Sequence, residues 1–244
     1  MWTFLFSGLA FACPPDDTHA QGYRAKRPTL SGEELTYGEE GGRFLVHYTL
    51  SGEDRPEGGD LDEDGVPDMV EAALNALDDS AAHFEEERGY IQVYPDNGAG
   101  GSEAVDLYIK MIESNGYANS VNGKGGTSCF MRLAPFIGSQ PEDVLSGVTA
   151  HELHHCIQFG YATGVEDWVN EATSTYEQYR YAEGVTNSYA LGFLYHERLQ
   201  GVGRRIDDTD GRFEYAAFLV MKFWVELAAG AGSLPELWES VARN

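Results

Sequence analysis

Basic residues are scarce in this sequence of 244 residues. Lys and Arg number 16 against 40 Asp and Glu, which gives a formal net charge of −24. A field of this sign repels nucleic acid and anionic lipid headgroups, so neither is an expected partner. It attracts divalent cations, although most of the carboxylates are expected to form a solvated acidic surface.

Long hydrophobic runs are also scarce. The apolar stretch from Met1 to Ala12 has signal-peptide length, is too short to span a bilayer and lacks a basic start. We interpret residues 1–20 as a signal segment and residues 21–42 as a polar tail, and we expect a secreted protein without a transmembrane segment. Cys13 follows Ala12 as in a bacterial lipoprotein cleavage site, so an outer-membrane lipoprotein is the alternative.

Cysteine is rare too, with Cys13, Cys129 and Cys156 only. Two thiols remain if Cys13 leaves with the signal segment or carries a lipid. Exported chains tend to pair their cysteines, so a disulfide between Cys129 and Cys156 is predicted. Two buried free thiols are the alternative.

What the chain does contain is enough apolar material for a packed core. Hydrophobic residues make up 42% and aromatic residues 12% of the sequence, which argues against disorder. Strands and a helix come first and helices alone follow, so we expect an α+β fold. Its parts would be an α/β lobe at residues 43–162 and a helical C-terminal lobe at 163–244, which is truncated if relatives extend further.

Hydrophobic periodicity and turn residues place the individual elements. Strands are predicted at 44–50, 90–94, 105–111 and 129–133. Helices are predicted at 69–88, 167–182 and 213–228, with loops at 51–68 and 114–128. A further helix should begin at a capping box formed by Ser139 and Glu142 and end at Gly160 to Gly164.

That helix contains three of the seven histidines, in His151-Glu152-Leu153-His154-His155. The pattern H-E-x-x-H places His151 and His155 one turn apart on one face, where both imidazoles reach one zinc ion. Glu152 lies beside them as the base for a water whose pKa zinc lowers toward about 7. His154 points elsewhere. A surface helix that contains histidines by chance is the alternative.

A catalytic zinc ion needs a third protein ligand and an open position. Gln158 and Tyr161 occupy the Gly and His positions of the extended motif H-E-x-x-H-x-x-G-x-x-H, which excludes a third histidine. Glu171 on the next predicted helix is favoured, because its aromatic neighbours indicate burial and an unpaired buried carboxylate is costly. The competing candidates are Glu166, Asp167 and Glu177.

Residues 60–71 fit the twelve-position calcium loop of an EF-hand. Gly65 at position six permits the sharp turn, and calcium takes six to eight oxygen ligands. The expected ligands are Asp60, Asp62, Asp64, the Val66 carbonyl, Asp68 and Glu71. The ion would be structural and would connect the strand at 44–50 to the helix at 69–88. An acidic solvated turn is the alternative.

HELHH and WVNEATS resemble the motifs of the gluzincin branch of zinc peptidases. FLVHYTLSG, DLDEDGVPDMVE and FEYAAFLVMKFW are similar to a family of secreted metalloproteases common in myxobacteria, so the resemblance covers residues 43–244. It implies a zincin-like fold, zinc ligands His151, His155 and Glu171, and Glu152 as the base. Fifteen residues separate His155 from Glu171, somewhat fewer than in the best-known gluzincins.

Gluzincins also use a Tyr or His from a later helix to stabilise the oxyanion. The resemblance favours Tyr215, with His196 second. We expect a monomeric, secreted zinc metalloprotease with structural calcium, whose protein or peptide substrate lies between the lobes and pairs with an edge strand near 116–133. The alternatives are an inactive zincin-like binding or adhesion module, against which the intact Glu152 argues, and a zinc hydrolase of a non-peptide substrate.

Overall fold

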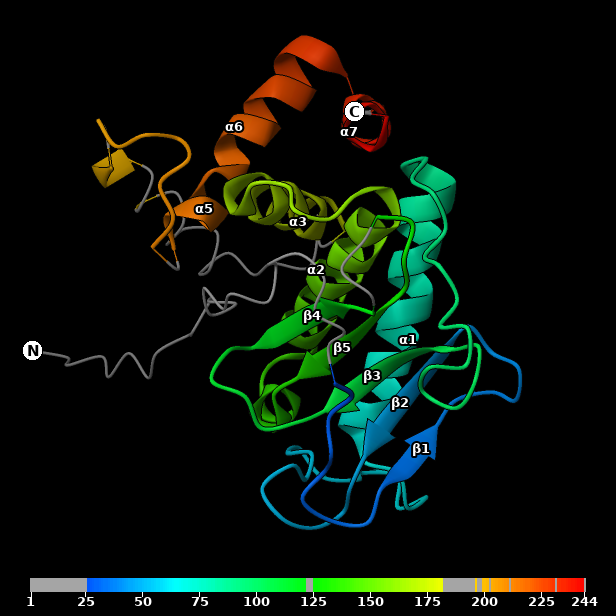
Figure 1. Cartoon of the computed structure of the whole chain (residues 1–244). Coiled ribbons are helices and arrows are strands. Elements are labelled where there is room, and N and C mark those ends of the chain that lie inside the picture. The colour runs from blue at the N-terminus through cyan, green and yellow to red at the C-terminus, as the bar shows by residue number, and fades with distance from the viewer. Residues whose placement is uncertain are drawn as a thin grey trace, which may run out of the picture.

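The computed structural model describes residues 26–121, 125–181, 196, 199–201, 203–210, 212–230 and 232–243. The expected signal segment and Cys13 lie outside these residues. Within them the fold is a mixed α+β fold, in which helices pack against one face of a five-stranded sheet and continue beyond one end of it (Figure 1).

The sheet combines parallel and antiparallel pairs. Its strands are β1 (Leu35–Tyr37), β2 (Phe44–Tyr48), β3 (Val105–Ile109), β4 (Gly116–Ser120) and β5 (Cys129–Leu133). The order across the sheet is β1-β2-β3-β5-β4. The three central strands run parallel to one another, and β1 and β4 pair antiparallel at the two edges. An edge strand, β4, therefore lies next to the helix that contains the histidine motif.

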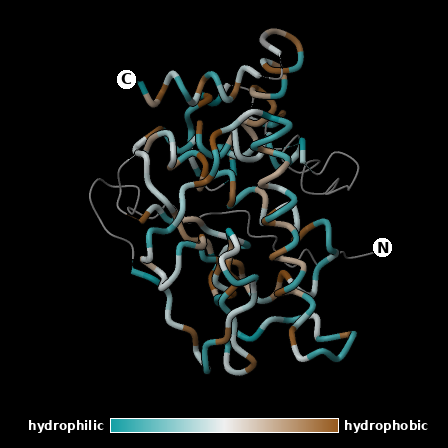
Figure 2. Tube along the Cα trace, turned by 90° about the vertical axis from the view of Figure 1, so that its right-hand side faces the viewer, coloured by the Kyte–Doolittle hydropathy of each residue, from teal (hydrophilic) through white to brown (hydrophobic). Residues whose placement is uncertain are grey.

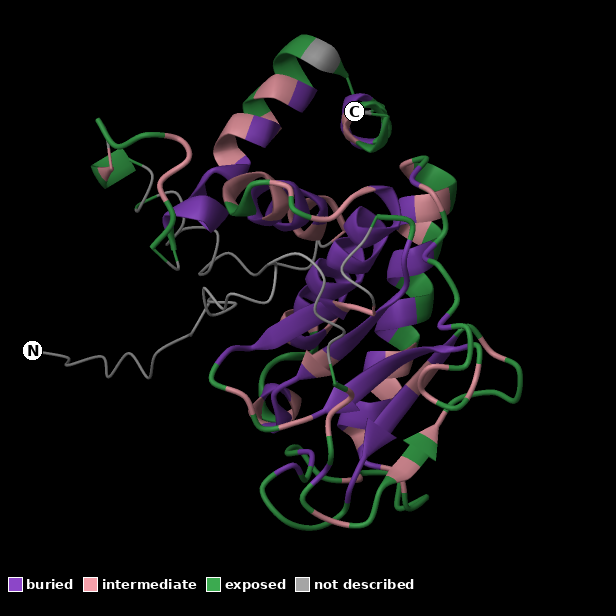
Figure 3. Cartoon of the chain, in the orientation of Figure 1, coloured by how far each residue is buried: buried purple, intermediate pink, exposed green. Residues whose placement is uncertain are grey.

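The helices form the second layer and the cap. They are α1 (Asp68–Ala82), η2 (His83–Glu87), η3 (Pro135–Ser139), α2 (Glu142–Tyr161), α3 (Asp167–Tyr181), α5 (Phe213–Ala216), α6 (Phe218–Phe223), η4 (Trp224–Ala229) and α7 (Ser233–Ala242). α1 and α2 pack together behind the sheet, over the inward side chains of Val46, Leu107 and Met131 (Figure 1). Figure 3 shows α2 buried along most of its length, as expected for a central helix.

The opposite face of the sheet is covered by residues 26–34. Leu30 packs there against Tyr108 and Phe130. Arg27 forms ion pairs with the carboxylates of Asp96 and Asp106, the second at 2.7 Å. Residues 21–42 were expected to be a polar tail. The described part of this segment, residues 26–42, instead covers one face of the sheet and contributes strand β1.

Several predicted elements are confirmed with shifted ends. The predicted strands at 44–50, 105–111 and 129–133 correspond to β2, β3 and β5. The predicted helix at 69–88 consists of α1 followed by the π-helical turn η2, and the one at 167–182 corresponds to α3. The predicted helix at 213–228 is divided into α5, α6 and the π-helical turn η4.

Other predictions about local structure are wrong. Residues 90–94 form no strand, because their backbone bonds to the neighbouring helices: Tyr90 N–H donates to the Phe84 carbonyl and Ile91 N–H donates to the Tyr161 hydroxyl. The predicted loop 114–128 contains β4.

The predicted capping box is also absent. The Ser139 hydroxyl donates to the Phe136 carbonyl within η3, and α2 begins after Pro141 without a side-chain cap. At its other end, α2 continues through Gly160 to Tyr161.

The C-terminal helix α7 is amphipathic. Brown and teal alternate along it in Figure 2, and its Leu234 and Trp238 are fully buried. Among the described helices, no single one is long and apolar enough to cross a membrane. Only Phe213–Ala228 and Ser233–Ala242 taken together, across a bend of 114°, meet the length and composition limits.

Candidate metal centre

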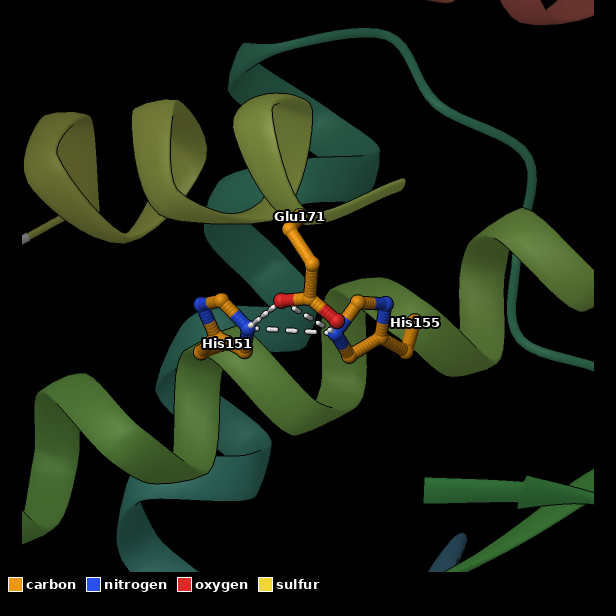
Figure 4. Close-up of side chains that lie close together, drawn as sticks. All are labelled: His151, His155 and Glu171. Carbon is orange, nitrogen blue, oxygen red and sulfur yellow. Dashed lines mark hydrogen bonds and ion pairs between the residues drawn. The ribbon is translucent and has the colours of Figure 1, made fainter. Parts of the chain in front are cut away.

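Three candidate ligands converge where α3 crosses α2. His151 and His155 project from adjacent turns of α2, and the Glu171 carboxylate descends from α3 between the two rings (Figure 4). The two Nε2 atoms are 3.1 Å apart. One Glu171 oxygen lies 3.1 Å from His151 Nε2 and 3.5 Å from His155 Nε2. The structure therefore brings together the three residues that the sequence favoured as zinc ligands.

These separations are compatible with one metal ion held by all three residues. Zinc–nitrogen and zinc–oxygen bonds of about 2.0 to 2.2 Å in a tetrahedral arrangement place ligand atoms about 3.3 to 3.6 Å apart, close to the distances found here. Two imidazoles and one carboxylate are also one of the donor sets of catalytic zinc sites, which leave a fourth position open. All three side chains are buried, so the site is shielded from bulk solvent.

The electrostatics of the three groups are coupled. Burial alone would raise the pKa of Glu171, but the charge of His155 and hydrogen bonds from His151 and His155 outweigh it and hold the pKa well below its usual range. Burial alone would lower the pKa of His155, yet the neighbouring Glu171 raises it to about 9. The cluster thus keeps a carboxylate ionised in a buried position, as a metal ligand requires.

Glu152 lies beside this cluster and is 3% exposed. Burial raises its pKa, although the charges of His151 and His155 partly oppose the increase. Its Oε2 atom has no hydrogen-bond partner among the described residues. A buried carboxylate oxygen without a partner is costly, which is typical of a group that acts on a substrate or a water molecule.

Gly116 of β4 is a site residue that sequence reasoning missed. A Cβ atom at this position would lie 2.5 Å from Glu152 Oε1 and 2.7 Å from its Cγ. Because Gly116 has no side chain, the Glu152 side chain can occupy the space beside it. The only sequence signal is a glycine in a segment predicted to be a loop, and that signal does not indicate which residue is close to it.

Two glutamines contact the outer nitrogens of the histidine pair. Gln178 Oε1 of α3 lies 3.1 Å from His151 Nδ1, and Gln158 Oε1 of α2 lies 2.8 Å from His155 Nδ1. Metal-binding histidines usually donate their second N–H to such a partner, which fixes the ring. In the sequence, Gln158 is notable only because it occupies the Gly position of the extended motif.

The structure separates the two candidates for the oxyanion donor. The Tyr215 ring of α5 is buried and stacks at 5.8 Å on the ring of His151. His196 is exposed, and no contact within the described chain joins it to the histidine pair. Tyr215 thus lies at the cluster, as the preferred candidate should.

The competing acidic residues lie elsewhere. Glu177 is buried, but it accepts two hydrogen bonds from Arg88 and one from Tyr90, all at 2.9 Å. Glu166 and Asp167 are exposed. None of the three belongs to the metal-capable groups among the described residues.

Residues 60–71 form a turn in which acidic side chains converge. Gly65 has a φ of +97°, and its N–H donates to Asp60 Oδ2 at 2.9 Å, which curls the loop around the first acidic residue. Asp60 Oδ1 is buried and has no partner among the described residues. Carboxylate oxygens converge in two overlapping groups, Asp60, Asp62 and Asp68, and Asp62, Asp64 and Glu71.

Cys129, Cys156 and His154 lie next to the candidate ligands but are not part of the cluster. Cys129 of β5 and Cys156 of α2 form a disulfide with a Cα–Cα distance of 5.4 Å, which is the predicted pairing. It anchors α2 to the sheet directly after His155. His154 points away from the cluster toward Ser174, and burial holds its pKa well below the usual value, so the ring is neutral.

Comparison with known proteins gives no family. No family model matches the chain, and no curated protein matches it. The function is therefore inferred from the geometry of the centre itself.

Proposed function

We propose that this chain is a zinc-dependent metallopeptidase with a zincin-like fold of the gluzincin type. One observation carries the proposal: Nε2 of His151, Nε2 of His155 and an oxygen of Glu171 converge within bonding distance of one ion, next to the buried Glu152 carboxylate. A metal that only stabilised the fold would not need this fourth group. A free acid beside an open coordination position is what hydrolysis by water requires.

The roles of the residues follow from their positions. A bound zinc ion would supply Lewis acidity, which polarises a carbonyl group and makes water a better nucleophile at neutral pH. Glu152 accepts a proton from the attacking water and passes it to the leaving nitrogen. Tyr215 donates a hydrogen bond to the oxygen that becomes negative. Burial of the cluster strengthens each of these interactions, because few water molecules screen them.

The position of β4 favours a peptide over other substrates. Among the described residues β4 is an edge strand of the sheet, and its first residue, Gly116, lies against the Glu152 side chain. An extended peptide can add to such an edge through main-chain hydrogen bonds. The scissile bond would then lie beside the proposed base. A non-peptide ester or amide would make no use of this edge.

The first prediction tests the reaction. Glu152→Gln removes the proposed base but retains the shape of the side chain, so hydrolysis of a casein-type substrate should fall about 10²- to 10⁴-fold. Metal analysis should still find one zinc ion per chain, because Glu152 is not a proposed ligand. Glu166→Gln, at an exposed acid before α3, is the matched control and should retain full activity.

Three results would contradict this proposal. Unchanged hydrolysis in Glu152→Gln would exclude the base. A purified wild-type protein that binds zinc but cleaves no peptide, with or without added zinc, would instead favour the binding or adhesion module. Cleavage of a small ester without cleavage of peptides would favour the hydrolase of a non-peptide substrate.

We also propose that residues 60–71 bind a structural calcium ion and that the protein is exported. The turn at Gly65 and the unpartnered Asp60 oxygen support the calcium site, which would connect β2 to α1. The disulfide between Cys129 and Cys156 supports export, because such bonds persist in oxidising compartments. Calcium is also abundant outside cells.

A further inference from the structure

Gln158 contacts both helices of the candidate metal centre. Its Oε1 lies 2.8 Å from His155 Nδ1 on α2. Its Nε2 lies 3.0 Å from the Asn170 carbonyl and 2.9 Å from the hydroxyls of Thr173 and Ser174, all on α3. The side chain is 1% exposed, so these protein groups take the place of water. One amide thus connects a candidate ligand on one helix to the helix that carries another.

The carbonyl of Asn170 fixes the orientation of this amide. A carbonyl oxygen can only accept a hydrogen bond, so the Gln158 atom that faces it must be the NH₂ group. The other end is then the oxygen, and His155 Nδ1 must carry the hydrogen that it accepts. In the neutral ring, His155 Nε2 is therefore free of hydrogen, and its lone pair faces His151 and Glu171.

Two hydroxyl groups of α3, together with His154 Nδ1 at 3.1 Å, surround the NH₂ group of Gln158. The Thr173 hydroxyl donates to the Val169 carbonyl at 2.8 Å, so it can accept from Gln158 Nε2. The Ser174 hydroxyl lies 2.9 Å from His154 Nδ1 and 3.2 Å from His155 Nδ1. This buried network connects α2 to α3 through Gln158, although His154 Nε2 has no hydrogen-bond partner among the described residues.

We propose that Gln158 is the positioning residue of this centre: it orients His155 for metal binding and holds α3, with Glu171, in place against α2. The inference rests on the proposed zinc function. Loss of the hydrogen-bond partner of a metal-binding histidine typically weakens metal affinity about 10- to 100-fold. Gln178 supports His151 in the same way, but its side chain is only half-buried.

The test compares three substitutions that keep side-chain length and remove the amide. These are Gln158→Met, Gln178→Met and, as the matched control, Gln140→Met at an exposed position after η3. The readout is the zinc dissociation constant, measured by competition with a chromogenic chelator, with circular dichroism as the check of folding. We expect zinc affinity about 10- to 100-fold weaker in Gln158→Met, a smaller loss in Gln178→Met, and no change in the control.

A Gln158→Met variant that folds and binds zinc within about twofold of wild type would overturn the inference. So would a larger loss in Gln178→Met than in Gln158→Met. A wild-type protein that binds no zinc would instead contradict the proposed function, so the two failures are distinguishable.

If Gln158→Met does not fold, Gln158→Glu tests the same two contacts. It retains an acceptor for His155 and removes the donor to the Asn170 carbonyl. We expect zinc affinity within about tenfold of wild type, together with a lower melting temperature. A greater loss of affinity would exclude the orienting contact, and an unchanged melting temperature would exclude the contact to α3.

Discussion

At the scale of single residues, Gly116 controls the space available to the proposed base. An alanine Cβ would lie 2.5 Å from Glu152 Oε1, so the flexible Glu152 side chain must move. A displacement of about 1 Å in a reacting group can cost about 10²-fold in rate. We therefore expect Gly116→Ala to lower kcat by roughly this factor in a peptide-hydrolysis assay, while zinc binding stays near the wild-type value.

The matched control is Gly232→Ala. Gly232 is exposed, has a φ of −78°, and has nothing within 4 Å of an added Cβ, so alanine fits there without displacement. Equal kcat values for the two variants would show that Gly116 does not limit the position of Glu152. A loss of zinc in Gly116→Ala would show that the strain reaches the ligands instead.

A second residue-scale prediction concerns pH. Burial lowers the pKa of His47, but its hydrogen bonds to Asp106 at 3.0 Å and Glu34 at 2.8 Å outweigh burial and raise it above 6.5. Folding therefore favours the protonated ring. Its contribution to stability is complete below about pH 6.5 and is lost as the pH rises through the higher folded-state pKa.

The check compares wild type with His47→Gln in urea unfolding, with zinc kept saturating, from about pH 5.5 to about pH 8.5. The difference in the free energy of unfolding should shrink as the pH rises across this range. Groups common to both proteins cancel in the difference. A difference that stays constant with pH would contradict the raised pKa of His47.

At the scale of elements, the disulfide connects α2, the helix that carries His151 and His155, to strand β5 of the sheet. Its cysteines are 27 residues apart, and closing a loop of this length stabilises a fold by about 3 kcal/mol through the unfolded chain. We expect the double variant Cys129→Ala, Cys156→Ala to lose about that much free energy of unfolding in urea. A reductant should destabilise wild type by a similar amount and leave the variant unchanged. Resistance of wild type to reductant with full stability of the variant would contradict this role.

The elements also show which parts of the fold are encoded locally. α1, α2 and α3 have apolar residues at helical spacing or a helical motif, so the sequence predicts them to within a few residues. β4 reads Gly-Tyr-Ala-Asn-Ser, and glycine and asparagine disfavour strands, yet its pairing with β5 overrides that preference. Residues 90–94 are rich in aromatic and β-branched residues, and Tyr90 and Val93 pack inward, but these two are three positions apart and their backbone pairs with no described strand.

The residues of the candidate centre also differ in how far the local sequence predicts their position. His151 and His155 follow from the i, i+4 spacing on one helix, which is a local property of the sequence. Glu171 is sixteen positions beyond His155, and its place depends on the crossing of α2 and α3. Gly116 and Gln178 reach the centre only through tertiary packing, and no spacing in the sequence indicates either contact.

At the scale of the whole molecule, the centre lies where two layers meet. α2 belongs to the layer on the sheet, and α3 begins the group of helices that continues through α5 and α6 (Figure 1). The metal would therefore join the two layers as well as serve the reaction. Removal of zinc should loosen the position of α3, and hydrogen exchange of its backbone amides should rise more than that of β3.

The net charge of −24 means that acidic side chains repel one another, and added salt of any kind screens this repulsion. A specific effect of calcium on stability must therefore be separated from general screening. We expect calcium at about 100 times its dissociation constant to raise the melting temperature by roughly 5 to 10 °C above sodium chloride of equal ionic strength. The difference should disappear in Asp60→Ala, which removes the first loop ligand, and persist in Glu53→Gln, which neutralises an exposed acid outside the loop. Equal effects of the two salts on wild type would show that residues 60–71 are an acidic turn whose charge is merely screened.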